Sequence, residues 1–195
     1  MKKIIFTAMV VFAFSFANAQ ETKFGAKVAL NIASLTGDVD NPSSLVGFQI
    51  GGFAEFKISE KFAIQPELMY SAQGGKESYS EEGFEVEGTT KLGYINIPIM
   101  AKYYVAKSFS LEAGPQIGFL MSAKAEMKAA GESLSVDVKD EVESVDFGLN
   151  FGAGYDFTEN LSAGLRYNLG LANAAKADNT DVKNSVFSIS VGYKF

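Results

Sequence analysis

The sequence predicts an all-β protein, an eight-stranded antiparallel up-and-down transmembrane β-barrel of the outer-membrane type. Three observations support this prediction. Apolar and polar residues alternate with a period of two along eight separate segments, as they do in strands that have two different faces. Short and long connections alternate between the segments, and aromatic residues gather at two levels along them, which is typical of barrels that cross an outer membrane.

The first 19 residues have the features of a cleaved secretory signal peptide. Lys2 and Lys3 form a positive start, an apolar run follows, and residues 17–19 are a cleavage site of the A-x-A type. The apolar run is short for a membrane span. We therefore expect residues 1–19 to be removed and residues 20–195 to form one β-barrel domain outside the cytoplasm.

Eight predicted strands follow this leader in order. On each strand, one side is almost entirely apolar and the other carries Gly, polar or charged residues. Each strand is long enough to cross a bilayer when it is tilted. The strands are Phe24–Ile32, Phe48–Ile58, Phe62–Tyr70, Ile95–Val105, Phe109–Met121, Val145–Phe157, Leu161–Leu171 and Val186–Phe195.

The lengths of the connections indicate which end of the barrel is periplasmic and which is extracellular. Three are tight turns, at residues 59–61, 106–108 and 158–160. The other four are long and polar, and short turns opposite long loops indicate a periplasmic and an extracellular end. The predicted long loops are Ser34–Ser44, Gly74–Thr89, Lys124–Glu143 and Ala172–Asn184.

A soluble ligand-carrying barrel also alternates over eight strands, so the two faces must decide between the alternatives. The interior of a narrow barrel is filled by side chains, and small residues with paired charges fill it better than a bulky apolar face does. The apolar face is therefore predicted to contact lipid. The other face forms a structural polar network in the lumen, made of Lys27, Glu55, Lys57, Glu67, Lys102, Glu112, Asp146, Asp156, Arg166 and Lys194.

The turn at Lys107 fixes a register for part of this network. It places Lys102 opposite Glu112 on the neighbouring strand, and an ion pair is expected between them. Arg166 is expected to face Gly152, which lets its long side chain reach across the lumen. Pro66, Pro98 and Pro115 lie inside predicted strands, where each loses a ladder hydrogen bond, and we expect bulges at these positions.

Aromatic residues are predicted to form two belts at the membrane interfaces. The belts lie eight to ten residues apart along the strands, about 20–25 Å at a tilt near 40°. One belt contains Phe24, Phe56, Phe62, Tyr103, Phe109, Phe157, Tyr193 and Phe195, and the other contains Phe48, Tyr70, Phe119, Phe147, Tyr167 and Phe187.

Four sequence blocks carry a resemblance to a known family. They are "YINIPIMAKYY", "LEAGPQIGFLMSAK", "DFGLNFGAGYDF" and "LSAGLRYNLGLAN". They resemble the outer-membrane β-barrel domain family of PorT-like porin-family proteins, over the whole mature chain. The resemblance implies a location in the Gram-negative outer membrane. It also implies that the terminal Phe195 is an assembly signal, because the barrel-assembly machinery reads the last strand of such proteins.

The composition excludes several kinds of catalysis. The chain contains no His and no Cys, so Ser-His-Asp triads, Cys nucleophiles and His-ligated zinc are excluded. The lumen carboxylates share their space with five basic residues, which favours ion pairs over an acid–base pair. The acidic residues Glu81, Glu82, Glu85 and Glu87 lack an ordered calcium-ligand spacing. We expect no enzyme activity, no cofactor and no bound metal.

Two functions remain as alternatives. The first is a small, monomeric barrel with a structural or surface-interaction role, whose partners are outer-membrane lipids and a protein at the extracellular loops. The second is a narrow channel for small solutes. Nucleic acid is not expected as a partner, because 15 basic residues face 23 acidic ones once Lys2 and Lys3 are removed, a net charge of −8.

Segment 133–145 keeps alternating beyond the membrane band. We therefore expect the fifth and sixth strands to extend above the outer leaflet as a hairpin with an exposed edge.

Overall fold

The computed structural model describes residues 22–81, 84–129, 132–177 and 180–195. The predicted signal peptide lies outside these residues and stays a prediction. No helix among the described residues is long and apolar enough to span a membrane.

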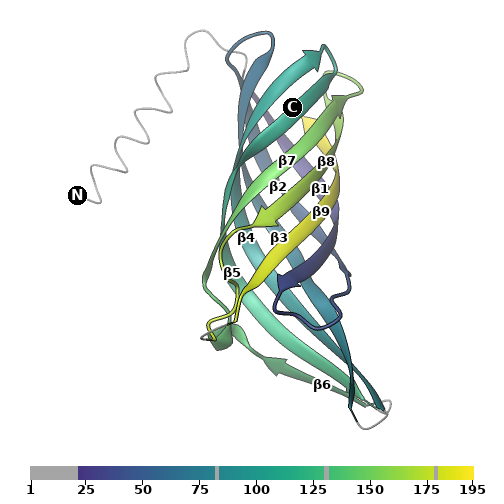
Figure 1. The fold of residues 1–195 in the computed structure, drawn as a ribbon. Coiled ribbons are helices and arrows are strands. Elements are labelled where there is room, and N and C mark those ends of the chain that lie inside the picture. Colours follow the sequence, from purple (N-terminus) through teal and green to yellow (C-terminus); the bar gives the residue numbers. More distant parts are fainter. Residues whose placement is uncertain (1–21, 82–83, 130–131, 178–179) are drawn as a thin grey trace, which may run out of the picture.

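Eight strands form a closed antiparallel ring, which confirms the predicted fold class (Figure 1). Consecutive ring strands pair with each other, and β1 pairs with β9 to close the barrel. The Phe195 N–H donates to the carbonyl oxygen of Phe24 at 2.8 Å, so pairing continues to the last residue. The ring strands are β1 (Thr22–Gly37), β2 (Leu45–Lys57), β3 (Phe62–Glu81), β4 (Phe84–Ala106), β5 (Phe109–Ala129), β7 (Val145–Asp156), β8 (Leu161–Gly170) and β9 (Val182–Lys194).

A ninth strand, β6 (Glu132–Asp137), pairs with β5 alone. Strands β3, β4 and β5 continue past the ring at the end away from the C-terminus, and β6 lies beside β5 there (Figure 1). The expected hairpin is therefore present, but β6 forms its second arm. The sixth barrel strand, β7, begins only after a short 3-10 helix, η1 (Lys139–Glu141).

This four-stranded extension corrects the predicted loop Gly74–Thr89. Most of that segment belongs to β3 and β4, which pair from Gly74 opposite Lys91 to Glu81 opposite Phe84. Two predicted loops are also shorter than expected, because β1 continues to Gly37 and β9 begins at Val182.

The expectation of bulges at the three prolines was wrong. Pro66 pairs opposite Ile99, and the same register resumes at Met69 opposite Asn96. Pro98 pairs opposite Gln116, with the register again unchanged beyond it. The prolines interrupt the hydrogen-bonded ladder without adding a residue to either strand, which is the minimum effect of a missing N–H donor.

Register shifts occur instead at two other places in β4, between Tyr104 and Ala106 beside the short turn and between Gly93 and Tyr94. Gly93 faces Ser122 and Tyr94 faces Leu120, so Met121 is an extra residue of β5. Met121 and Ser122 are both exposed, whereas Leu120 and Ala123 are both buried. An extra residue shifts the two-residue alternation by one. Odd-numbered residues of β5 therefore face outward before the bulge and inward after it.

The bulge divides β5 into a membrane part and an extracellular part. Below it, odd-numbered residues such as Leu111 and Phe119 are exposed on the lipid-facing side. Above it, the even-numbered residues Lys124, Glu126 and Lys128 occupy that outer side. The charged residues of β5 therefore face outward only beyond the outer aromatic belt, where water and polar headgroups replace lipid tails.

The outer surface of the ring is apolar and the interior is mostly polar. Residues of both predicted aromatic belts lie on the outside, among them Phe24 and Phe109 toward the short turns and Phe48 and Phe147 toward the loops. Within the described residues, buried apolar side chains cluster near the extracellular mouth, where Leu92, Tyr94, Leu120 and Ala123 pack together. Leu35, Val138 and Val142 pack against this cluster from the mouth side.

Candidate functional site

A single ion-pair network fills the lumen near the short turns. It connects eight charged side chains, four positive and four negative, through contacts of 3.5 Å or less. Equal numbers of opposite charges allow the group to be buried without a net charge. In order of contact, its members are Lys27, Glu67, Arg166, Glu112, Lys102, Glu55, Lys194 and Asp156.

Glu67 organises one half of this network. Its carboxylate accepts two hydrogen bonds from Arg166, at 2.8 and 2.9 Å, and one from Lys27 Nζ at 2.6 Å. Gln65 Nε2 donates to the same carboxylate at 2.7 Å. Glu67 is only 3% exposed, so nearly every acceptor direction of a buried carboxylate is used, as burial of a charge requires.

Glu55 organises the other half. It accepts hydrogen bonds from Lys102 Nζ at 2.8 Å, Lys194 Nζ at 3.3 Å and the Tyr104 hydroxyl at 3.1 Å. Lys194 also donates to Asp156, at 3.1 and 3.2 Å.

Glu112 joins the two halves. It accepts from Arg166 at 3.1 Å and lies 3.5 Å from Lys102 Nζ. The predicted register of Lys102 opposite Glu112, and of Arg166 opposite Gly152, is the one in the structure.

A layer of neutral amides and hydroxyls lies between the ion pairs and the mouth. Asn31 donates to Ser71 Oγ at 3.1 Å and accepts from Ser188 Oγ at 3.1 Å. On the opposite wall, Asn168 donates to Asn150, which donates to Gln116, each at 3.2 Å. These hydrogen bonds tie neighbouring strands together along the inner wall, and the Asn31–Ser71 bond joins β1 to β3 past β2.

Asp146 stands apart from the ion-pair network in which the sequence placed it. It is 3% exposed and pairs in register with Gly118, which in turn pairs with Asn96. Asp146 Oδ1 and Asn96 Oδ1 have no hydrogen-bond partner among the described residues. Lys57 is half-buried near the short-turn end and has an interaction of its own.

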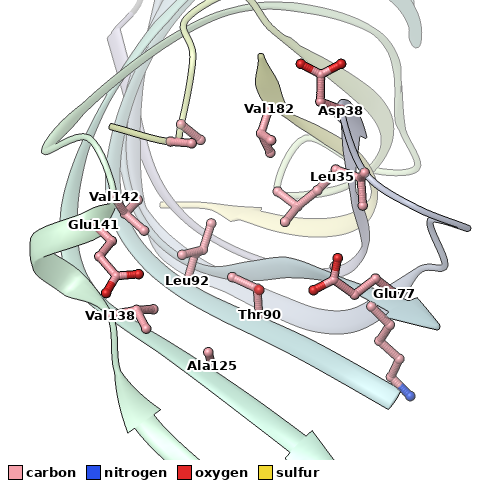
Figure 2. Close-up of a pocket in the computed structure, with 15 residues that line it drawn as sticks. Leu35, Asp38, Glu77, Thr90, Leu92, Ala125, Val138, Glu141, Val142 and Val182 are labelled. Atoms are coloured by element: carbon pink, nitrogen blue, oxygen red, sulfur yellow. The ribbon is translucent and has the colours of Figure 1, made fainter. Parts of the chain in front are cut away.

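The extracellular mouth contains a feature that the sequence did not reveal. A cavity of about 260 Å³ is lined by β1, β3, β4, β5, the η1 segment and the loop before β9 (Figure 2). Its wall includes Leu35, Leu92, Val138, Val142 and Val182. No local sequence pattern locates it: of the alternating residues Leu134, Val136 and Val138 beyond the membrane band, only Val138 lines the cavity.

The extracellular sheet has two different faces. Met127 pairs opposite Leu134, and Ala125 pairs opposite Val136, so these apolar residues share the face that continues from the cavity. The opposite face is charged, and Lys91 Nζ donates to both oxygens of Glu126 at 2.7 Å. This hydrogen bond lowers the pKa of the exposed Glu126 carboxyl below its ordinary value.

The described residues contain no cluster of three or more His, Cys, Asp or Glu side chains that could hold a metal ion. The acidic segment considered for calcium lies partly outside the described residues, at positions 82–83.

These features define an integral β-barrel with a filled lumen and a structured extracellular sheet. The model of the outer membrane protein beta-barrel domain family matches residues 16–176. The chain belongs to this family and is a protein of the Gram-negative outer membrane. No curated protein matches the chain.

Two solved structures show the same fold. The attachment invasion locus protein Ail of Yersinia pestis, solved in complex with the heparin analogue sucrose octasulfate, is 16% identical with a TM-score of 0.51. The alignment covers 90% of this chain and 99% of Ail. Neisserial surface protein A is 14% identical with a TM-score of 0.55, over 90% of this chain and 99% of that protein. At these identities the likeness concerns the fold.

Proposed function

We propose that this protein is a closed membrane anchor that presents its extracellular sheet to a protein partner and catalyses no reaction. The observation that carries the proposal is the edge strand β6, which pairs with β5 on one side only. An unpaired edge is a template for an extended segment of another chain. Leu134 and Val136 on this strand are 64% and 49% exposed, so an added strand would also gain apolar contacts.

The lumen supports a structural role for the barrel. The four carboxylates of the ion-pair network are each bound by Lys or Arg, which opposes their use as an acid–base pair. The cavity beside Lys27, Lys102, Glu112 and Arg166 measures about 20 Å³, enough for about one water molecule. That volume argues against the alternative of a narrow solute channel.

The proposal also includes the finer family placement and the oligomeric state. The four quoted sequence blocks support membership of the PorT-like group, and the closed ring, which needs no second chain to pair its edges, is consistent with a monomer. The expected partners at the membrane are the outer-membrane lipids and, through Phe195, the barrel-assembly machinery.

A capture experiment on intact cells tests the surface-interaction role. The wild-type protein and the variant Leu134→Glu would be expressed at equal surface levels, and partners would be fixed by chemical cross-linking and identified. Ser133→Glu is the matched control, because Ser133 pairs opposite Lys128 on the other face of the sheet, where a carboxylate meets an opposite charge. We expect wild type and Ser133→Glu to retain the same partner and Leu134→Glu to lose it. Equal capture by all three proteins would refute the proposed role of this sheet.

A further inference from the structure

The cavity at the extracellular mouth is built by segments from distant parts of the chain. Its volume is about 260 Å³, slightly below the ~300–1,000 Å³ of pockets that take drug-sized ligands. The aliphatic side chains on its wall favour the apolar part of a ligand, since burial of apolar surface is the main gain in such sites. Leu92 belongs both to this wall and to the apolar cluster beneath it.

The charges around this wall are mostly negative. Asp38, Glu77 and Glu141 line the cavity, and Lys76 is the one basic residue that lines it. In Figure 2 the carboxylates of Glu77 and Glu141 lie on opposite sides of the cavity, with Leu92 and Thr90 between them. Among the described residues, no ion pair or side-chain hydrogen bond engages Glu77 or Glu141, whereas Asp38 accepts a hydrogen bond from the Asp181 N–H at 2.9 Å.

Close packing holds the strand side of the cavity in place. A Cβ atom added at Gly75 would lie 2.9 Å from Leu35 N and 3.1 Å from Leu35 Cγ. Leu35 therefore rests directly on the backbone of β3. Glu77 packs in the same way over its register partner Gly88, where an added Cβ would lie 2.9 Å from the Glu77 side chain.

Backbone hydrogen bonds hold the loop side. The Glu143 N–H donates to Ala174 O at 2.8 Å, and the Lys176 N–H donates to Glu141 O at 3.0 Å. These bonds join the η1 segment to the loop before β9, so the wall that carries Glu141 and Val142 is attached at both ends. The site is thus formed before any ligand enters, which reduces the ordering cost of binding.

We propose that this cavity binds a small organic cation, a compact apolar or aromatic body that carries one ammonium group. The aliphatic wall contacts the apolar body, and the ammonium group lies between the carboxylates of Glu77 and Glu141. An anion of the same shape is excluded, because it would place a negative charge beside these two groups.

Two indole probes of opposite charge test the proposal. Tryptamine and indole-3-propionate share one ring system and a two-carbon side chain, which ends in an ammonium group or a carboxylate. The protein contains no Trp, so indole fluorescence, excited where Tyr does not absorb, reports only the probe. With the full-length mature chain folded in detergent micelles, we expect a saturable blue shift for tryptamine and none for indole-3-propionate, beyond the signal of empty micelles.

Three variants connect the signal to the cavity. The double variant Glu77→Gln/Glu141→Gln should weaken tryptamine binding by about five- to tenfold, the effect of losing two partly exposed ion pairs. Glu143→Gln, two positions from Glu141 and outside the cavity lining, should leave the affinity unchanged. Ala125→Phe should fill the cavity and abolish binding, with heat-modifiable gel mobility used to verify that the barrel is folded. Equal binding of both probes, or unchanged tryptamine affinity in the double variant, would overturn the proposal.

Discussion

At the scale of single residues, Glu67 is the best-connected charge in the lumen. Replacing it with Gln keeps the shape but leaves Lys27 and Arg166 with Glu112 as their nearby carboxylate. Removing one partner from a buried ion pair costs about 3–5 kcal/mol, because the remaining charge stays desolvated. We expect Glu67→Gln to lower the free energy of unfolding by that amount, measured by urea-dependent unfolding in lipid vesicles.

The control for this measurement is Glu60→Gln, in an exposed periplasmic turn. This variant should leave the free energy of unfolding unchanged within the error of the method. If Glu67→Gln behaved like Glu60→Gln, the lumen network would contribute nothing to stability.

Asp146 should respond to the same kind of substitution in the opposite direction. Its Oδ1 atom is buried without a hydrogen-bond partner among the described residues, and Asn96 presents a second unpartnered oxygen nearby. A buried unsatisfied group costs about 1–3 kcal/mol. We therefore expect Asp146→Asn to raise the free energy of unfolding by about 1–2 kcal/mol in the same urea assay. A loss of stability in Asp146→Asn would contradict this prediction.

Phe195 has two proposed roles, packing at the membrane interface and recognition by the barrel-assembly machinery, and its deletion can separate them. Its side chain is 76% exposed and contacts Tyr193 edge-on, with ring centroids 5.6 Å apart. Burial of one aromatic side chain at the interface contributes at most about 3 kcal/mol, and the closed ladder remains without it. Deletion of Phe195 should therefore leave refolding into detergent nearly intact, as judged by heat-modifiable gel mobility.

In cells, the same deletion should sharply lower the amount of protein in the outer membrane, because the assembly machinery loses its signal. Equal losses in the two assays would make Phe195 a packing residue and leave the recognition role unsupported.

At the scale of elements, the sequence predicted the strands of the ring and a hairpin that continues from the fifth strand, but not the continuation of β3 and β4 outside the membrane. Inside lipid, every outward position must be apolar, so the two-residue period is clean from Phe109 to Met121. Beyond Met121 the apolar residues keep odd numbers although the faces are exchanged. A pattern of residue types does not contain the position of one extra residue, so the predicted loop Lys124–Glu143 begins where β5 in fact continues to Ala129.

The exchange of faces at the β5 bulge can be tested by insertion. One Ser inserted between Ala123 and Lys124 would turn Ala125 and Met127 outward and Lys124 and Glu126 inward, because one residue reverses the alternation. A two-residue Ser-Thr insertion at the same site keeps the faces and serves as the control. We expect the single insertion to accelerate hydrogen exchange and proteolysis across residues 124–137, with the barrel still folded by gel mobility. Equal protection in both variants would show that the two faces are interchangeable.

The candidate site, like the strands, could be predicted from the sequence only in part. Eight of the ten lumen residues meet in one network because strand parity and the turn at Lys107 together determine which side chains face inward. The sequence could not exclude Asp146 from this network. The two-residue alternation predicts that its side chain faces the lumen, but not its level along the barrel axis. The mouth cavity depends on contacts between η1 and the loop before β9, which no local sequence pattern encodes.

At the scale of the whole molecule, the interior is closed at two heights. Lys102 in the ion-pair network and Tyr94 in the apolar cluster lie on the same strand, eight residues apart. At about 3.3 Å per residue and a tilt near 40°, this separation is about 20 Å along the barrel axis. A solute would have to pass both layers, and the network alone leaves space for about one water molecule.

Two closures in series predict a specific pattern of ion conductance in planar bilayers. The wild-type protein should give no current steps in molar KCl. The double variant Glu67→Ala/Arg166→Ala removes one negative and one positive group from the network, yet it should stay closed because Leu92, Tyr94 and Leu120 still close the lumen beneath the mouth cavity. Tyr94→Ala alone should stay closed for the converse reason. Only the triple variant Glu67→Ala/Arg166→Ala/Tyr94→Ala should conduct, since it alone widens both the ion-pair layer and the apolar layer. Steps from the wild-type protein would favour the solute channel, and steps from either partial variant would show that one layer makes the whole seal.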